Sequence, residues 1–114
     1  MSTTSALLGA LLAAAPQPVE TIERAVDLVA TRVVPIYRRI FKPECVTLMA
    51  EGEINLHFDV AIREKHDEKC GGDPATASIV DRFRVLRGTS TVQWYDPVNG
   101  EYLPFERFLE SRRR

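Results

Sequence analysis

The sequence predicts an α+β domain of two layers, in which one long kinked helix packs on a three- to four-stranded antiparallel meander sheet. Apolar residues recur at steps of three and four over residues 18–43. From Val46 onward they alternate with polar residues at a period of two. Polar segments with Gly and Pro separate the alternating runs, as expected where a chain turns back at each strand end. A chain of 114 residues builds a single core, so one domain is expected.

The first fifteen residues carry no charged side chain and predict an export signal. Residues 6–15 read ALLGALLAAA, an apolar run that ends in small residues before Pro16. A helix needs about 20 apolar residues to span a bilayer, so this run is too short, and its ending is typical of a secretory signal peptide. No Lys or Arg precedes the run, and a short N-terminal helix is the alternative. We therefore expect a signal peptide at 1–15 and a single α+β domain at 16–114, in the periplasm or secreted.

The helix is expected between Pro18 and Pro43. Its apolar stripe consists of Ile22, Val26, Val29, Val33, Ile36 and Ile40. Acidic residues gather early in this segment and arginines late, which complements the helix dipole. Pro35 has no N–H to donate, so it is expected to kink the helix or divide it in two.

Four strands are expected to follow, over residues 46–50, 54–62, 78–87 and 91–95. The second is the clearest, because its apolar residues alternate without interruption: Ile54, Leu56, Phe58, Val60 and Ile62. A turn is expected at residues 51–53 and a polar loop over residues 64–77. Residues 105–109 fit either a last helical turn or a fifth, short strand.

Cys45 and Cys70 are the only cysteines. An even pair in a small exported domain predicts one disulfide, whereas in the cytosol the two residues would be free thiols. Closing a loop of this length stabilises a fold by roughly 3.5 kcal/mol. The chain has no CxxC motif, so neither a redox centre nor a zinc knuckle is indicated.

The chain shows no motif that predicts catalysis, a cofactor or a metal. It lacks the spaced glycines of a phosphate-binding loop and the GxSxG motif of a serine hydrolase. His66 belongs to a charged run over residues 63–70 with Asp67, Glu68 and Cys70, but the spacing of these residues is not one that a particular metal requires. The formal charge is −1, which argues against a dedicated nucleic-acid binder. No catalytic, metal or cofactor residue is therefore predicted.

One candidate binding surface is the polar face of the second and third strands. His57 and Asp59 are two positions apart and so share a face of their strand, and Arg82 and Arg84 do the same on the next strand. Such a cluster can serve acid/base chemistry or bind an anionic group. The alternative is an ordinary solvated sheet face held by cross-strand pairs.

The second candidate surface is the loop that contains Cys70-Gly71-Gly72-Asp73-Pro74. The two glycines allow positive φ beside the cross-link, the Asp73 side chain can cap the following turn, and Pro74 fixes the exit. The segment is either a rigid structural turn or a preorganised loop that is presented to a partner. His66 belongs to the same loop.

Residues 64–85 resemble a segment of small exported bacterial proteins of uncharacterised function. The likeness rests on His66, on Cys70-Gly71-Gly72-Asp73-Pro74 and on Phe83-Arg84-Val85, since those proteins carry a similar His-x-x-x-Cys-Gly-Gly-Asp-Pro segment between two strands. It covers about a fifth of the chain. The resemblance implies an exported bacterial protein with a paired Cys70, and it implies no catalytic residue.

Together these observations predict a non-enzymatic exported binding protein of inhibitor or immunity type, whose partner is another protein of the cell envelope. The alternative is a small-ligand carrier or small enzyme with a pocket between helix and sheet. His57, Asp59 and Tyr37 would be the polar groups of that pocket. Pairing of two copies through a sheet edge, which would make a homodimer, stays open.

Overall fold

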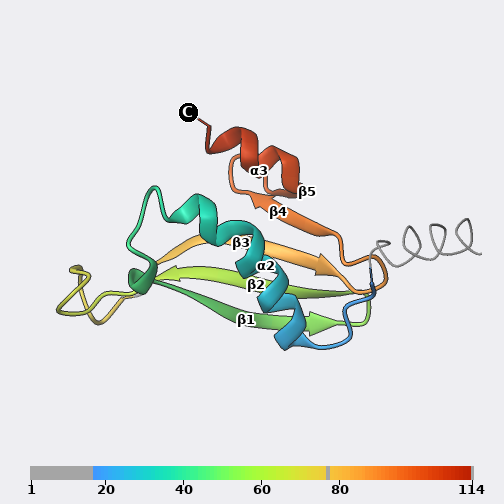
Figure 1. Ribbon diagram of the computed structural model, residues 1–114, viewed down its shortest axis with the longest axis horizontal. Helices are drawn as coiled ribbons and strands as arrows, with labels where there is room; N and C mark the ends of the chain where they lie inside the picture. Colours follow the sequence, from blue (N-terminus) through green and yellow to red (C-terminus); the bar gives the residue numbers. More distant parts are fainter. Residues whose placement is uncertain (1–16, 77, 114) are drawn as a thin grey trace, which may run out of the picture.

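The computed structural model describes residues 17–76 and 78–113. The predicted signal peptide therefore lies outside the described residues. The elements are α2 (Ile22–Tyr37), the 3-10 turn η1 (Pro43–Cys45), β1 (Val46–Ile54), β2 (His57–Glu64), β3 (Ile79–Leu86), β4 (Val92–Asp96), β5 (Glu101–Pro104) and α3 (Phe105–Ser111). The strands form one antiparallel sheet in the order β1-β2-β3-β4-β5. Helix α2 lies across β1, β2 and β3, and α3 lies against β4 and β5 (Figure 1).

The prediction of one long kinked helix is wrong. Helix α2 has 16 residues, and it begins after Thr21, whose hydroxyl accepts a hydrogen bond from the Arg24 N–H at 3.2 Å. Pro35 lies in its last turn, and the helix ends at Tyr37. Proline has no backbone N–H to donate, so it interrupts the hydrogen bonding of the helix. Pro35 is followed by the end of the helix and does not mark a kink within it. As a result Ile40, which was expected in the apolar stripe, is 54% exposed.

The prediction of three to four strands is also wrong, because the described sheet has five. The additional strand β5 pairs with β4, with Tyr102 opposite Tyr95. It has only four residues and ends in a proline, so no alternation was visible in the sequence. The residues that follow form helix α3, which is one of the two interpretations left open.

The first hairpin differs from the expected one in where the chain turns. Strand β1 continues to Ile54, and the turn falls at Asn55 and Leu56. The expected turn lies inside β1, where the register shifts between Ala50 and Gly52 in a β-bulge. Ile54 and Leu56, which were expected in the core, are 58% and 76% exposed.

The core lies between the helices and one face of the sheet. Alternation places Phe58, Val60 and Ile62 of β2 in it, fully buried. On the helix side it is closed by Val29 and Val33, and α3 contributes Phe108, which contacts Phe83 edge-on with ring centroids 5.1 Å apart. Both helices thus cover the same face, and no described element covers the opposite one, which we call the outer face.

The predicted disulfide between Cys45 and Cys70 is confirmed. It joins η1, just before β1, to the loop between β2 and β3, with the two Cα atoms 5.5 Å apart. Backbone bonding reinforces the junction, since the Lys65 N–H donates to the Cys45 carbonyl at 2.8 Å. No helix within residues 17–76 and 78–113 is long and apolar enough to cross a membrane.

Candidate functional site

The outer face carries the polar side chains that the sequence singled out. Strand β2 contributes His57 and Asp59 and β3 contributes Arg82 and Arg84, because their neighbours Phe58 and Phe83 point into the core. The register sets Asp59 directly opposite Arg84. The four predicted residues therefore share one surface of the sheet.

Asp59 connects two of the other three side chains, Arg84 and His57. The Arg84 Nε–H donates to Asp59 Oδ1 at 3.3 Å, and His57 Nε2 lies 3.7 Å from the same oxygen. The Asp59 side chain is 24% exposed, so water still reaches the cluster. The carboxylate partly neutralises Arg84 and fixes its guanidinium in place.

Arg82 belongs to a second cluster, which is centred on Glu51. The Arg82 Nε–H donates to a Glu51 carboxylate oxygen at 3.2 Å, and a terminal nitrogen of Arg63 lies 3.8 Å from the other oxygen. Sequence reasoning missed Glu51 because it assigned that residue to a turn. The signal that could have found it is the Glu51-Gly52 pair inside an otherwise extended segment, which is typical of a bulge.

Two tyrosines, Tyr95 and Tyr102, complete the outer face. Tyr95 and Tyr102 lie opposite each other on β4 and β5, with ring centroids 5.2 Å apart. The Arg84 guanidinium stacks over the Tyr102 ring, 3.8 Å from its centroid. Burial, together with the negative charge of Asp59, raises the pKa of Tyr102 above its ordinary value. Tyr102 therefore stays a neutral hydroxyl that can donate a hydrogen bond.

The loop that follows β2 begins with a turn built around Asp67. The Asp67 carboxylate accepts from the N–H groups of Lys69 and Cys70 at 2.9 and 2.8 Å, and its carbonyl accepts from the Gly71 N–H. Gly71 then adopts φ +77°, and nothing lies within 4 Å of where its Cβ would be. Gly71 is thus an open point of the loop.

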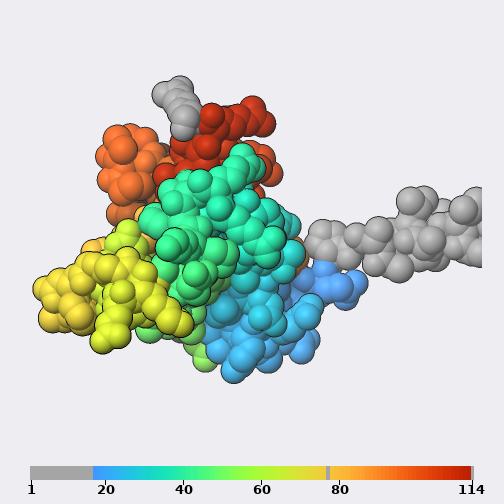
Figure 2. All heavy atoms as spheres, turned by 60° about the vertical axis from the view of Figure 1, so that its left-hand side comes forward, coloured from blue at the N-terminus to red at the C-terminus, as the bar shows by residue number. Residues whose placement is uncertain are grey.

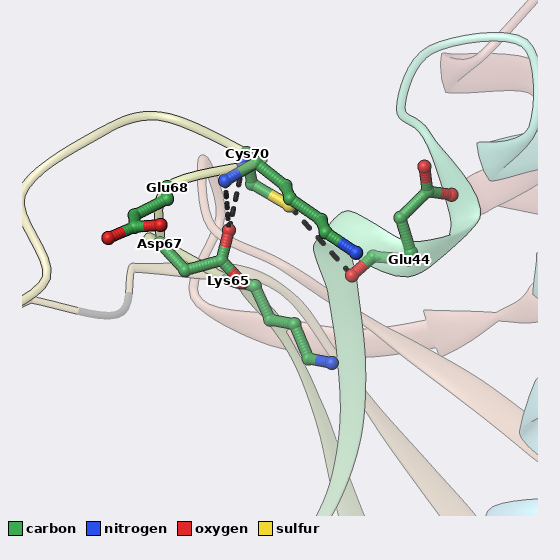
Figure 3. Close-up of a pocket in the computed structure, with 6 residues that line it drawn as sticks. Glu44, Lys65, Asp67, Glu68 and Cys70 are labelled. Atoms are coloured by element: carbon green, nitrogen blue, oxygen red, sulfur yellow. Dashed lines mark hydrogen bonds between the residues drawn. The ribbon is translucent and has the colours of Figure 1, made fainter.

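A shallow hollow lies beside the cross-link (Figure 3). Its volume is about 430 Å³, and it is lined by Glu44, Lys65, Asp67, Glu68, Lys69 and Cys70. The Asp67 carboxylate is already used by the turn. Within the described part of the chain, no group of three or more His, Cys, Asp or Glu side chains is arranged to hold a metal ion.

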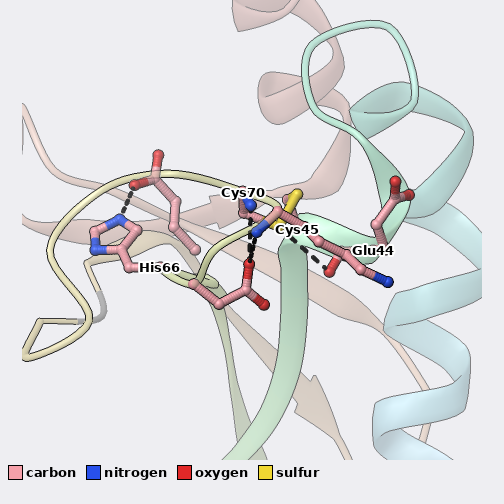
Figure 4. Close-up of a disulfide and its surroundings, with 7 residues drawn as sticks. Glu44, Cys45, His66 and Cys70 are labelled. Atoms are coloured by element: carbon pink, nitrogen blue, oxygen red, sulfur yellow. Dashed lines mark hydrogen bonds and ion pairs between the residues drawn. A yellow bond between two sulfur atoms is a disulfide. The ribbon is translucent and has the colours of Figure 1, made fainter.

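His66 fixes the second half of the loop from inside (Figure 4). Its Nε2 lies 2.9 Å from a Glu64 carboxylate oxygen, and its Nδ1 lies 3.1 Å from the Asp73 carbonyl and 3.0 Å from the Thr76 hydroxyl. The bond to Glu64 raises the pKa of His66 above its ordinary value. With both ring nitrogens engaged, His66 acts here as a positioning residue of the loop.

Gly72 and Asp73 also stabilise the conformation of this loop. Gly72 adopts φ +80°, and a Cβ on it would lie 2.7 Å from the His66 ring, so only glycine fits there. The Asp73 side chain caps the next turn by accepting from the Ala75 N–H at 2.9 Å. These two residues hold the loop's shape.

A buried polar cluster on the core side escaped sequence reasoning. The Asp81 carboxylate accepts from the Tyr37 hydroxyl, from the Trp94 indole N–H at 2.9 Å and from the Arg112 guanidinium at 2.6 Å. Burial, with the adjacent Asp81 charge, raises the pKa of Tyr37 far above its ordinary value. Asp81 was missed because it precedes Arg82 in what reads as a polar stretch of a strand.

The structure separates the polar groups that the pocket alternative would combine. Tyr37 is the last residue of α2 and is buried on the core side of the sheet, whereas His57 and Asp59 lie on the outer face. The hollow that Tyr37 lines between α2 and β1 measures about 60 Å³, which is well below the roughly 300 Å³ of a small-molecule pocket.

Comparisons of the chain with known protein families, with curated protein sequences and with solved structures find no match.

Proposed function

We propose that this chain is a non-enzymatic binding protein of inhibitor or immunity type, and that it contacts another protein of the cell envelope through its outer face. The observation that carries the proposal is that this face is uncovered by any described element, while its charged side chains are already fixed by one another. A surface of this kind loses little side-chain entropy when a partner binds.

The residue types on the outer face support a protein partner. Tyr and Arg are the residues that most often dominate the binding energy of protein interfaces, and Tyr95, Tyr102 and Arg84 lie together there. Arg84 is held from two sides, by Asp59 and by the Tyr102 ring. It therefore presents a fixed guanidinium edge at the centre of the face.

The cross-linked loop extends this surface at one end. Arg63 lies next to the end of β2 from which the loop leaves, and Arg82 lies in the first half of β3, to which the loop returns. The disulfide and the His66 contacts preorganise that segment. The loop contributes Gly71 as a contact point, with His66, Gly72 and Asp73 as its internal support.

The disulfide is typical of proteins from oxidising compartments. The apolar run at residues 6–15 and the resemblance of the loop to small exported bacterial proteins support export to the periplasm or beyond. An envelope partner follows from that location.

Site-specific photo-cross-linking tests the proposal. Benzoylphenylalanine placed at Tyr95, a close isostere on the outer face, is expected to give one discrete adduct in an envelope extract of the native host. The same group placed at Glu23, on the exposed side of α2, provides the matched control and is expected to give none.

The variant Arg84→Gln tests whether the adduct at Tyr95 depends on binding through the outer face. Loss of a central hot-spot residue weakens binding by about 30-fold or more, so the Tyr95 adduct is expected to disappear at unchanged protein concentration. Equal adducts from both positions, or an adduct that Arg84→Gln leaves unchanged, would overturn the proposal. The melting temperature of each variant checks that the fold is intact.

A further inference from the structure

The fold gathers basic side chains from two distant parts of the sequence at one end of the molecule. Arg38, Arg39 and Lys42 follow α2, and Arg113 follows α3. We call these four residues the basic end. The turn after α2 and helix α3 lie side by side (Figures 1 and 2), with the turn in teal and α3 in red.

Contacts of Tyr37 hold the two segments together. Its ring lies 6.0 Å from Phe41 of the turn and 6.0 Å from Phe108 of α3, centroid to centroid. Its hydroxyl and the Arg112 guanidinium donate to the same Asp81 oxygen. The residues that follow Tyr37 and Arg112 in the chain are therefore kept at the same end of the domain.

The basic end has no compensating acid among the described residues. All four side chains are exposed, and none lies within ion-pair distance of a described carboxylate. Of the acids nearest in sequence, Glu110 pairs with Arg107 at 3.8 Å, and Glu44 lines the hollow beside the disulfide. Four positive charges thus face solvent on a chain whose formal net charge is −1.

An exposed apolar side chain lies among these charges. Ile40 is 54% exposed, directly after Arg39. The turn that carries it is ordered by two backbone bonds, in which the Ile40 and Phe41 N–H groups donate to the Tyr37 carbonyl at 2.9 and 2.7 Å. Ile40 is consequently held outward on the projecting turn and not buried against the core.

We propose that the basic end binds the anionic headgroups of a phospholipid bilayer. The four charges are spread over two segments, the turn after α2 and the end of α3, so this surface suits an extended array of anions better than a single small anion. Basic side chains attract anionic lipids, and an apolar side chain between them inserts at the headgroup boundary. Ile40 flanked by Arg39 and Lys42 has this combination.

None of the basic-end residues lies on the outer face. When the basic end is bound to a membrane surface, the outer face therefore remains free for its partner. Each basic residue near an anionic bilayer contributes about five-fold to the partition coefficient at moderate salt. Removing two charges is therefore expected to weaken binding by about 25-fold.

Vesicle co-sedimentation of the full chain tests the inference. We expect binding to vesicles that contain phosphatidylglycerol, weak binding to pure phosphatidylcholine, and release by added salt. Because the apolar run at residues 6–15 can itself favour lipid, the measured quantity is the ratio of the partition coefficients on the two vesicle types. The double variant Arg38→Gln/Arg39→Gln is expected to lower this ratio by about 25-fold, and Ile40→Ser is expected to lower binding to both vesicle types.

The matched control is Arg24→Gln/Lys69→Gln, which removes the same two charges from exposed positions elsewhere. It is expected to bind as the unmodified chain does. The inference is overturned if the two double variants lose binding equally, if lipid charge has no effect, or if the basic end binds duplex DNA or an acidic protein but not the vesicles. The photo-cross-linking result at Tyr95 does not depend on any of these outcomes.

Discussion

The two faces of the sheet use the same chemical pair, an aspartate with an arginine, in opposite surroundings. On the core side, the Asp81 side chain is 4% exposed and accepts from Arg112, Tyr37 and Trp94. On the outer face, Asp59 is 24% exposed and pairs with Arg84 across neighbouring strands. The buried Asp81 carboxylate connects α2, β4 and the residue after α3, whereas the Asp59 carboxylate orients an arginine on the surface.

The difference teaches that burial, and not the residue types, decides what each pair does. A carboxylate removed from water costs free energy unless its oxygens are bonded, so every donor around Asp81 matters to stability. A carboxylate near water regains solvation when its partner is lost, so Asp59 contributes little to folding. Its arrangement with Arg84 and Tyr102 remains available for binding.

The largest expected effect comes from Asp81→Ala. The change leaves the Tyr37 hydroxyl, the Trp94 N–H and the Arg112 guanidinium without their acceptor, and breaking a buried pair in this way costs about 3–5 kcal/mol. Urea denaturation followed by Trp94 fluorescence measures it. A loss below about 1 kcal/mol would show that the two faces do not differ as argued.

A milder variant keeps the test usable if Asp81→Ala does not fold. Tyr37→Phe removes one donor to the same carboxylate and retains the ring packing against Phe41 and Phe108. A hydrogen bond to a charged group contributes about 1.5–3 kcal/mol, and a loss in that range is expected. Tyr95→Phe on the outer face is the matched control, with an expected change within about 0.5 kcal/mol.

Removal of the disulfide is expected to have the next largest effect. It tests whether the contacts of the buried face alone keep the domain folded. Cys45→Ser/Cys70→Ser is expected to lower the free energy of unfolding by roughly 3 kcal/mol, because the cross-link spans a sequence separation of 25. The unmodified chain measured with and without reductant is the control and should show the same difference. An unchanged denaturation midpoint after reduction would contradict this role.

The sequence predicted the parts of the fold that depend on local pattern. Strand β2 is an example, because uninterrupted alternation over Phe58, Val60 and Ile62 reflects one buried face. The cysteine pair is another, since compartment and count limit the alternatives. The candidate residues His57, Asp59 and Arg84 came together for the same reason, as alternation alone fixes which face they share.

The parts that failed depend on register and on contacts between distant segments. The chain continues through a bulge between Ala50 and Gly52, and the hairpin turn falls at Asn55 and Leu56 instead of residues 51–53. The hydrophobic alternation of residues 54–62 does not reveal this change. The buried cluster around Asp81 joins Tyr37 to Arg112, 75 positions apart in the printed sequence. No local pattern indicates such a contact.

A smaller effect is expected on the outer face itself. Asp59→Ala removes the partner of Arg84, and exposed or half-exposed pairs contribute about 0–1 kcal/mol, so stability should change by no more than that. Urea denaturation at low and high salt measures it, and high salt should reduce the difference between variant and unmodified chain. A loss of 2 kcal/mol or more, about 30-fold in the folding equilibrium, would mean that the outer face is a structural element.

The smallest effect concerns the protonation of His66. Because contact with Glu64 raises its pKa in the folded chain, the protonated ring stabilises the loop fully below the ordinary histidine pKa of about 6.5. That contribution is lost as the pH rises through the higher folded-state pKa, where the ring gives up a proton and one of its two nitrogens can no longer donate a hydrogen bond. The Thr76 N–H, which donates to the Asp73 carbonyl beside His66 Nδ1, should exchange with solvent faster above that pH.

An NMR titration checks this in the His57→Gln background, which leaves His66 as the only histidine. Its imidazole signal should titrate above 6.5, and Glu64→Gln should move the midpoint back toward 6.5 because the main cause of the raised pKa is then absent. Hydrogen exchange at Thr76 should lose its pH step, beyond the intrinsic change, in His66→Gln. A midpoint at or below 6.5, or a Thr76 step that persists in His66→Gln, would show that the cross-link alone holds the loop.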